Sequence, residues 1–270
     1  MSRKIAMAIA AHPDDIEFMM GGTLILLKKA GYETHYLNLS AGSCGSMDHP
    51  AGKLRDIRKN EAEKAAAILG AVHHPTLGDD LEIFYELGTL RRLAAIIRQV
   101  HPAILLIPSP QDYMEDHTNT CRLAVTAAFS AGIPNFRTNP KTKPVKGEVT
   151  LYHAMPHGLR DPLRRRIIPG ALVNTTEIQS RKTDALKAHE SQQNWLDESQ
   201  KISAYLQTME DFSRDLGRQS RWFKYAEGWR RHLHYGFCNE SSDPLKEALG
   251  DLCFINKKYE EDLEQGIPPR

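Results

Sequence analysis

One imidazole and two neighbouring carboxylates stand together in the segment His12-Pro13-Asp14-Asp15. An apolar run ends just before this segment, and a second apolar run begins at Met19. Charges placed between apolar runs are costly unless something pairs with them, and a divalent metal ion is the simplest such partner. The alternative is an ordinary turn in which proline fixes the backbone and an aspartate caps the next helix.

A second dense group of polar side chains follows the apolar run 103–108, and it includes Asp112, Asp116 and His117. The carboxyl ends of strands in an open α/β sheet border the crevice where ligands bind, so we expect both segments at that edge. Two imidazoles and one carboxylate with an open position suit catalytic zinc. Asp14 would then be placed to take a proton from a water that the metal has acidified.

Strands and helices alternate through the first half of the chain. Apolar runs and helical spacing predict strands at 4–11, 34–39, 72–77 and 103–108, and helices at 19–30, 54–69, 87–100 and 118–131. The run 103–108 is continuously apolar, as expected for a central parallel strand that is covered on both faces. This alternation predicts a right-handed, doubly wound parallel sheet, that is, a Rossmann-like three-layer α/β sandwich.

The second half of the chain is less regular. We expect strands at 148–155 and 170–174, a helix at 177–193 and a long helix at 195–216 that is a candidate lid or homo-oligomer contact. Beyond residue 243 the sequence predicts a polar helix and a loose end. The whole chain, 1–270, is therefore expected to form one domain with a core at about 4–230 and a C-terminal helical extension in the polar tail 243–270.

The composition is that of an ordinary globular protein, with 41% hydrophobic and 26% charged residues. A formal net charge of +1 gives no reason to expect nucleic acid as a partner. No apolar stretch approaches the length of a membrane span, and the N-terminal run is too short for a signal peptide. The 4 cysteines are far apart and predict reduced thiols in a cytoplasmic protein.

The first segment, with an Asp-His pair about a hundred residues later, resembles the PIG-L/LmbE-like zinc-dependent deacetylases. That family includes de-N-acetylases of N-acetylglucosaminyl-phosphatidylinositol and of the sugar precursors of mycothiol and bacillithiol. Three further stretches also resemble family patterns: Arg58-x-x-Glu61 with Leu69-Gly70, the run from Lys187 to Gln192, and the run from Tyr225 to Trp229.

The resemblance implies that His12, Asp15 and His117 hold one zinc ion per chain and that Asp14 is the general base. It also implies that Asp116 orients a ligand or the acid. Arg58, Asp80, Tyr113 and His189 are weaker candidates for substrate contacts, and a structural role is open for each of them.

One position departs from the family pattern. Members commonly carry a histidine three residues before the last ligand, where it is thought to stabilise the oxyanion or protonate the leaving amine, and here that position is Met114. Three explanations are open. His153, His157 or His189 fills the space; zinc and Tyr113 stabilise the oxyanion while one carboxylate serves as both base and acid; or the protein binds a ligand without rapid turnover.

The sequence therefore predicts a zinc-dependent hydrolase that removes an acetyl group from an N-acetylated amino sugar or its conjugate. One rival is a catalytically weakened sugar-binding or regulatory protein that contains a metal. A second rival, a nucleotide-binding dehydrogenase, lacks support because no G-x-G-x-x-G turn follows the first strand.

Overall fold

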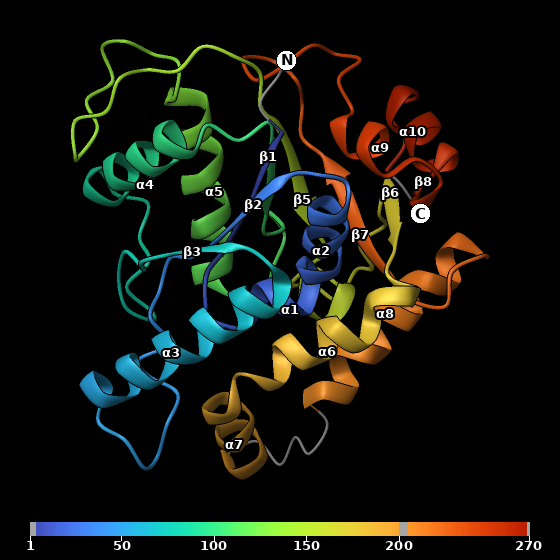
Figure 1. The fold of residues 1–270 in the computed structure, drawn as a ribbon. Helices are drawn as coiled ribbons and strands as arrows, with labels where there is room; N and C mark the ends of the chain where they lie inside the picture. The colour runs from blue at the N-terminus through green and yellow to red at the C-terminus, as the bar shows by residue number, and fades with distance from the viewer. Residues whose placement is uncertain (1–3, 200–204, 269–270) are drawn as a thin grey trace.

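One mixed sheet forms the centre of the computed structural model, which describes residues 4–199 and 205–268 (Figure 1). The strands lie in the order β3-β2-β1-β4-β5-β7-β6-β8. Their bounds are β1 Ile5–Ala10, β2 Glu33–Asn38, β3 Val72–His74, β4 Ile104–Ile107, β5 Thr150–Ala154, β6 Ala171–Asn174, β7 Ala226–Arg231 and β8 Cys253–Ile255. The first five strands pair in parallel, whereas β7, β6 and β8 are antiparallel to their neighbours.

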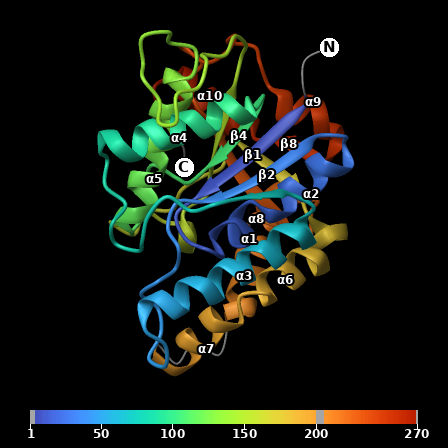
Figure 2. The ribbon, with the colours of Figure 1, turned by 60° about the vertical axis from the view of Figure 1, so that its left-hand side comes forward.

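Helices cover both faces of the sheet, which confirms the predicted three-layer α/β sandwich. The first half of the chain contributes α1 Asp15–Met19, α2 Gly21–Lys29, α3 Ala51–Leu69, α4 Leu87–Val100 and α5 Glu115–Ser130. The second half contributes α6 Gln179–Lys187, α7 Glu190–Ser199, α8 Tyr205–Ser220, α9 Pro244–Leu249 and α10 Lys257–Glu264. Figures 1 and 2 show α4 and α5 on one face and α2, α3, α6 and α8 on the other.

The central strand β1 is buried along its whole length, so its alternating side chains serve both cores. Ala6, Ala8 and Ala10 belong to the core on the face of the sheet that α2 covers. Ile5 and Met7 belong to the opposite core beneath α4 and α5. This double burial explains why β1 reads as one continuous apolar run.

The predicted helix 19–30 is divided at Met20, where the backbone leaves helical geometry between α1 and α2. A carboxylate explains the new start, because Glu227 of β7 accepts hydrogen bonds from the backbone N–H groups of Gly22 and Thr23 at 2.8 and 2.7 Å. The buried ammonium group of Lys182 lies 2.8 Å from the same carboxylate. The run from Tyr225 to Trp229, which resembles a family pattern and contains Glu227, therefore anchors the N-terminus of α2.

The second half of the chain departs further from the prediction. Strand β7 was not predicted, although it lies between β5 and β6 in the sheet. The tail contains α9 and α10, as expected, and no helix or strand follows α10 at residues 265–268, but the tail also contains an edge strand, β8, that was not predicted and that pairs with β6. The predicted helix 177–193 is split into a 3₁₀ turn at Thr176–Ile178, α6 and the start of α7. The predicted helix 195–216 crosses residues 200–204, which lie outside the described residues.

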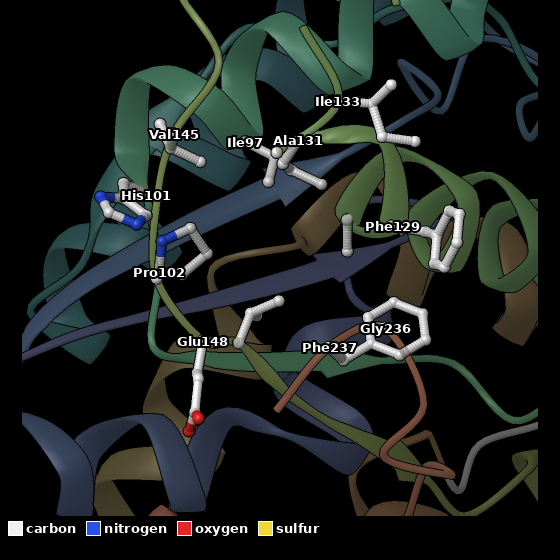
Figure 3. Close-up of a pocket in the computed structure, with 14 residues that line it drawn as sticks. Ile97, His101, Pro102, Phe129, Ala131, Ile133, Val145, Glu148, Gly236 and Phe237 are labelled. Carbon is white, nitrogen blue, oxygen red and sulfur yellow. The ribbon is translucent and has the colours of Figure 1, made fainter. Parts of the chain in front are cut away.

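A cavity of about 260 Å³ opens at the amino ends of β4 and β5 (Figure 3). Its walls are largely apolar and include Ile97, Phe129 and Phe237, with His101 and Glu148 as ionisable groups. None of the predicted site residues lines it. Within residues 4–199 and 205–268, no helix has the length and apolar character needed to cross a membrane.

Candidate metal centre and catalytic pocket

The predicted site lies where the strand order reverses. Strand β2 lies on one side of β1 and β4 on the other, so the loops after β1 and β4 diverge and leave a crevice at the carboxyl edge. The loop after β1 carries His12 and Asp14 and leads into α1 at Asp15, and the loop after β4 leads into α5 at Glu115. Helix α5 begins earlier than predicted, so His117 lies in its first turn.

The three predicted ligands meet in this crevice. One ligand atom from each of His12, Asp15 and His117 lies within 4.8 Å of the other two, and no second group of this kind occurs among the described residues. The Nδ1 atom of His12 is 3.5 Å from Asp15 Oδ2, and the Nε2 atom of His117 is 3.4 Å from Asp15 Oδ1. The arrangement brings together two imidazoles and one carboxylate, a donor set that fits a zinc ion.

Each imidazole is held from behind by a further carboxylate. His12 Nε2 is 3.0 Å from Asp116 Oδ2, and His117 Nδ1 is 2.9 Å from Asp112 Oδ1. These contacts leave His12 Nδ1 and His117 Nε2 facing Asp15. Carboxylates that accept from the outer nitrogen of a ligating histidine fix its tautomer and orientation. Asp116, which was predicted to orient a ligand or the acid, contacts His12, and Asp112, which was not predicted as a site residue, contacts His117 in the same way.

The electrostatics of the group favour positive charge. Burial alone would lower the pKa of His12, but hydrogen bonds to Asp116 and Asp15 outweigh it and raise the pKa to about 9. Burial is also outweighed at His117, where Asp15 and Asp112 raise the pKa well above its usual range. Burial would raise the pKa of Asp15, but the neighbouring imidazoles hold it well below its usual value. The crevice is therefore built to stabilise cations.

The carboxylate of Asp14 contacts two residues outside the group of three ligands. Its φ of 116° is a strained value for a residue with a side chain. The hydroxyl of Tyr205 donates to Asp14 Oδ2 at 2.6 Å, and the guanidinium of Arg58 lies 3.9 Å from the same oxygen. Burial raises the pKa of Asp14 despite the attraction of Arg58. Tyr205 was not predicted as a site residue, because it lies 191 residues further along the chain.

These groups open into a cavity of about 460 Å³. Its walls include the predicted substrate residues Arg58, Asp80 and Tyr113. The carboxylate of Asp80 accepts from Ser40, Gly42 and Cys44 and therefore holds the loop after β2. Tyr113 is 62% exposed and presents its ring at the mouth of the cavity, edge-on to His117.

Two of the family-like stretches contact each other beside this cavity. Arg58 of α3 donates to Gln192 of α7 and to the backbone carbonyl of Pro13. Glu61, one turn further along α3, accepts from the backbone N–H and hydroxyl of Ser191 at 2.9 and 2.7 Å. The R-x-x-E pattern therefore fixes the start of α7 against the loop that carries Asp14.

The structure places His189 outside the cavity walls. Its side chain is fully buried, and its Nε2 atom lies 3.4 Å from Glu17 Oε1, which is also fully buried. The second carboxylate oxygen of Glu17 accepts from the hydroxyl of Tyr36 at 3.3 Å. His189 thus belongs to a buried polar cluster beneath the loop after β1.

Met114 lines the cavity, and among the three histidines weighed as replacements for the family histidine, His157 lines it too. His157 follows β5, and its ring packs against Phe18 and Tyr113 with centroid distances of 5.3 and 6.1 Å. Burial lowers its pKa, which favours the neutral imidazole. His153 instead contacts His232 and does not line the cavity.

Comparison with known proteins agrees with this geometry. The family model described as PIG-L, GlcNAc-PI de-N-acetylase, matches residues 7–129, a range that holds all three predicted ligands. Diacetylchitobiose deacetylase from Thermococcus kodakarensis is 30% identical over 197 residues, which span 70% of this chain and 70% of that protein. The chain belongs to the PIG-L family. The predicted family resemblance is thereby confirmed.

Two further comparisons place this PIG-L member among its relatives. N,N'-diacetylchitobiose deacetylase from Pyrococcus horikoshii has the same fold, with a TM-score of 0.70, 24% identity and coverage of 86% of this chain and 84% of that chain. The 4-oxalmesaconate hydratase of Pseudomonas putida is 29% identical over 236 residues, which span 84% of this chain and 88% of that protein. The relatives therefore include proteins named for two different reactions.

Proposed function

We propose that this PIG-L member is a zinc-dependent deacetylase that releases acetate from an N-acetylated amino sugar or its conjugate. The observation that carries the proposal is the convergence of His12, Asp15 and His117 beside a buried, separately held carboxylate, Asp14. A cavity of about 460 Å³ next to these groups is large enough for a sugar. The deacetylases among the relatives support the same reaction.

A zinc ion bound by His12, Asp15 and His117 would polarise the amide carbonyl and acidify the attacking water. Asp14 accepts the proton of that water while Tyr205 holds its Oδ2 atom, which leaves Oδ1 free for the reaction. The water oxygen bonds to the amide carbon, the carbon–nitrogen bond then breaks, and the proton on Asp14 passes to the leaving amine. The products are acetate and the free amine.

We propose that His157 takes the role of the family histidine, because Met114 at that position cannot donate a hydrogen bond. A neutral imidazole on the cavity wall can donate a hydrogen bond to the oxygen that gains negative charge during attack. The low pKa of His157 that burial causes suits this role, because a neutral donor does not repel the metal. Tyr113, exposed at the mouth, is placed to contact the sugar instead.

The test is acetate release from N,N'-diacetylchitobiose and N-acetylglucosamine by the zinc-loaded protein. We expect Asp14→Asn to lower kcat about 10²–10⁴-fold, the usual contribution of a general base. The matched control is Asp56→Asn, which removes an exposed carboxylate of α3 and should leave kcat unchanged. Full activity of Asp14→Asn on a substrate turned over by the wild type would overturn the assignment.

A second candidate is the addition of water to a carbon–carbon double bond of a carboxylated substrate. The favouring observation is the similarity to 4-oxalmesaconate hydratase, which extends over more of the chain than that to the deacetylase from Thermococcus kodakarensis. The same metal and base would activate water for either reaction. Loss of the double-bond absorbance of 4-oxalmesaconate, with no acetate release from acetamides, would identify the hydratase.

We also propose that the protein works in the cytoplasm on a small molecule. The support is its thiols: Cys44, Cys121, Cys238 and Cys253 are free, and Cys44 is exposed. Expressing the tagged protein in cells and measuring the fraction of it that lies in the cytosol would test this proposal.

A further inference from the structure

A second, much smaller chamber adjoins the predicted metal centre. Its volume is about 30 Å³, and it shares four wall residues with the large cavity: Asp15, Phe18, His117 and His157. Two of these are predicted zinc ligands, so the chamber lies directly beside the position of the metal. Asp14 is not among its walls, whereas it does line the large cavity.

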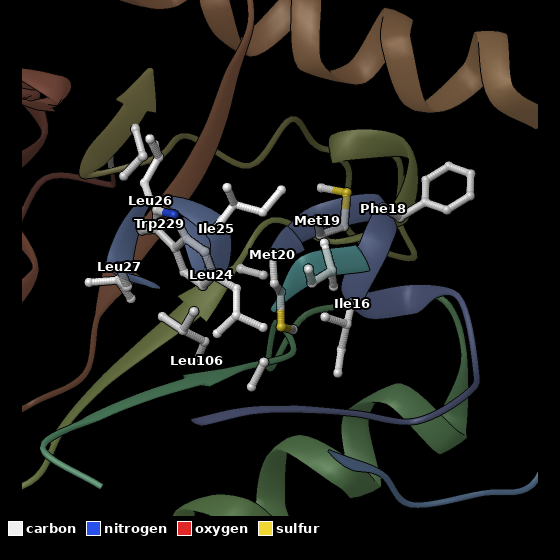
Figure 4. Packing of buried hydrophobic residues seen from close by; sticks show 14 of the residues in the cluster. Ile16, Phe18, Met19, Met20, Leu24, Ile25, Leu26, Leu27, Leu106 and Trp229 are labelled. Atoms are coloured by element: carbon white, nitrogen blue, oxygen red, sulfur yellow. The ribbon is translucent and has the colours of Figure 1, made fainter. Parts of the chain in front are cut away.

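The far walls of the chamber are apolar and closed. They are formed by small residues at the ends of β1, β4 and β5 and by three methionines, and they comprise Ala10, Met19, Met20, Pro108, Ala154 and Met155. Met20 and Met155 are each 2% exposed, so the chamber has no outlet on that side. Figure 4 shows Met20 extending from the junction of α1 and α2 toward the sheet, while Phe18 projects on the other side of the helix.

The polar groups of the chamber are already engaged. Asp112 accepts from the His117 ring through Oδ1 and from the backbone N–H of His157 through Oδ2. The hydroxyl of Ser109 donates to the carbonyl of Gln111 and accepts from Arg230. What the chamber offers a ligand is therefore mainly apolar surface.

The size of the chamber limits its occupant. A space of about 10–15 Å³ on this measure holds one water-sized group. The chamber, at about 30 Å³, exceeds this minimum only two- to threefold, so it suits a short acyl group such as acetyl. A butyryl chain has two more methylene groups and would have to displace Met20 or Met155.

We propose that this chamber is the acyl pocket and that Met155 and Met20 restrict the substrate to formyl and acetyl amides. The inference rests on the proposed function. It gives the base, the acyl group and the amine each a separate place around the amide carbon. The base Asp14 lies on the Tyr205 side, the acyl group enters the chamber, and the amine with its sugar lies in the large cavity.

The walls of the chamber also favour one of the two candidate reactions over the other. The carboxylates of Asp15 and Asp112 line it, and the remaining walls are mostly apolar. A substrate carboxylate placed there would be desolvated next to like charge, which is unfavourable. A methyl group meets neither cost, so the chamber favours an acetamide over a carboxylated substrate.

The first test needs no substitution. Acetohydroxamate, propionohydroxamate and butyrohydroxamate chelate zinc through the same atoms and differ in alkyl length alone. Isothermal titration calorimetry on the zinc-loaded wild type should show butyrohydroxamate binding about tenfold or more weakly than acetohydroxamate, because overfilling a packed cavity is costly. Equal or rising affinity with chain length would overturn the proposal.

Two variants move the limit in opposite directions. Met155→Ala enlarges the chamber and should bring butyrohydroxamate to within about threefold of acetohydroxamate, whereas the volume-conserving Met155→Leu should keep the wild-type order. Ala154→Val fills the chamber and should weaken acetohydroxamate relative to formohydroxamate. An unchanged chain-length profile in folded Met155→Ala and Ala154→Val protein would contradict the assignment.

The outcome can be separated from that of the proposed function. A chain-length limit in binding without acetate release from any acetamide leaves the chamber in place and refutes the deacetylase. Acetate release with no limit refutes the chamber alone. Failure of all hydroxamates to bind the zinc-loaded protein overturns both.

Discussion

Two pairs of imidazoles lie in this protein with nearly the same ring geometry. The rings of His12 and His117 are 5.3 Å apart with an interplanar angle of 56°, and those of His153 and His232 are 5.1 Å apart at 52°. Their neighbours differ. The first pair is surrounded by carboxylates, whereas the second contacts a backbone carbonyl, a thiol and the nearby charge of Arg230.

The neighbours give the two pairs opposite chemistry. Carboxylates outweigh burial and raise the pKa of His12 to about 9, whereas burial, with no carboxylate to offset it, lowers the pKa of His153 to about 4. One pair therefore attracts a cation, and the other is a neutral packing pair. We therefore propose that the surrounding acids, and not the proximity of two histidines alone, make the first pair a metal site.

Of the three imidazoles weighed as replacements for the family histidine, His157 and His153 should differ most in their effect on turnover. His157→Ala removes the proposed oxyanion donor and should lower kcat about 10²–10³-fold with little change in KM. His153→Ala removes a buried imidazole outside the cavity and should leave kcat within about twofold, although the protein becomes less stable. Acetate release under saturating substrate measures both, and the reverse order would refute the assignment of His157.

Without their neighbouring carboxylates, His12 and His117 should resemble His153 and His232 and bind zinc less tightly. Asp112→Asn and Asp116→Asn each take away a carboxylate that orients a ligating imidazole, so zinc affinity should fall about 10–100-fold. Competition with a fluorescent chelator measures the affinity. The control Asp56→Asn changes an exposed carboxylate and should bind zinc as the wild type does. Undiminished affinity in both site variants would show that the imidazoles suffice.

A smaller effect is expected at the base. Tyr205→Phe removes the hydrogen bond to Asp14 Oδ2 and should lower kcat about tenfold while KM stays within about twofold, because misplacement of the base affects the transition state alone. Tyr225→Phe is the matched control. The hydroxyl of Tyr225 donates to Glu210 of α8, the helix that also carries Tyr205, and neither Tyr225 nor Glu210 lines the cavity. Equal losses in the two variants would indicate a merely structural hydroxyl.

The smallest effect concerns the neutral pair. The pKa of His153 is about 4 in the folded protein, below its ordinary value of 6.5. Between these values the unfolded chain binds a proton that the folded chain does not, so folding stability is lost as the pH falls. Urea unfolding at pH 7 and pH 5 should show that wild type loses about 1–2 kcal/mol more than His153→Gln. A loss of equal size in both proteins would mean that His153 does not titrate as its surroundings require.

Local patterns in the sequence were enough to predict the parallel half of the sheet and to select three candidate ligands that lie close together in the structure. His12 and Asp15 are three residues apart in the segment after β1, and His117 lies in the first turn of α5, the helix that follows β4. Short-range spacing was therefore enough to identify these three residues as candidates. The same is true of β1 and β4, because burial on both faces makes their sequences continuously apolar.

Long-range contacts account for what the sequence did not predict. Tyr205 and Glu227 act on Asp14 and on the start of α2 from about two hundred residues away, and no spacing rule links them. Strand β7 carries Glu227 and two arginines, so its composition does not indicate a strand; its neighbours β5 and β6 provide the pairing. The tertiary environment overrides local propensity at these places.

The proposed metal centre depends on the acids that surround His12 and His117. Its most direct test is the zinc content per chain of protein purified without added metal, measured by plasma mass spectrometry for wild type, His117→Ala and the control His232→Ala. We expect about one zinc per chain in wild type and in His232→Ala, and almost none in His117→Ala. Wild type without zinc that also fails to take it up, or zinc retained in His117→Ala and lost in His232→Ala, would contradict it.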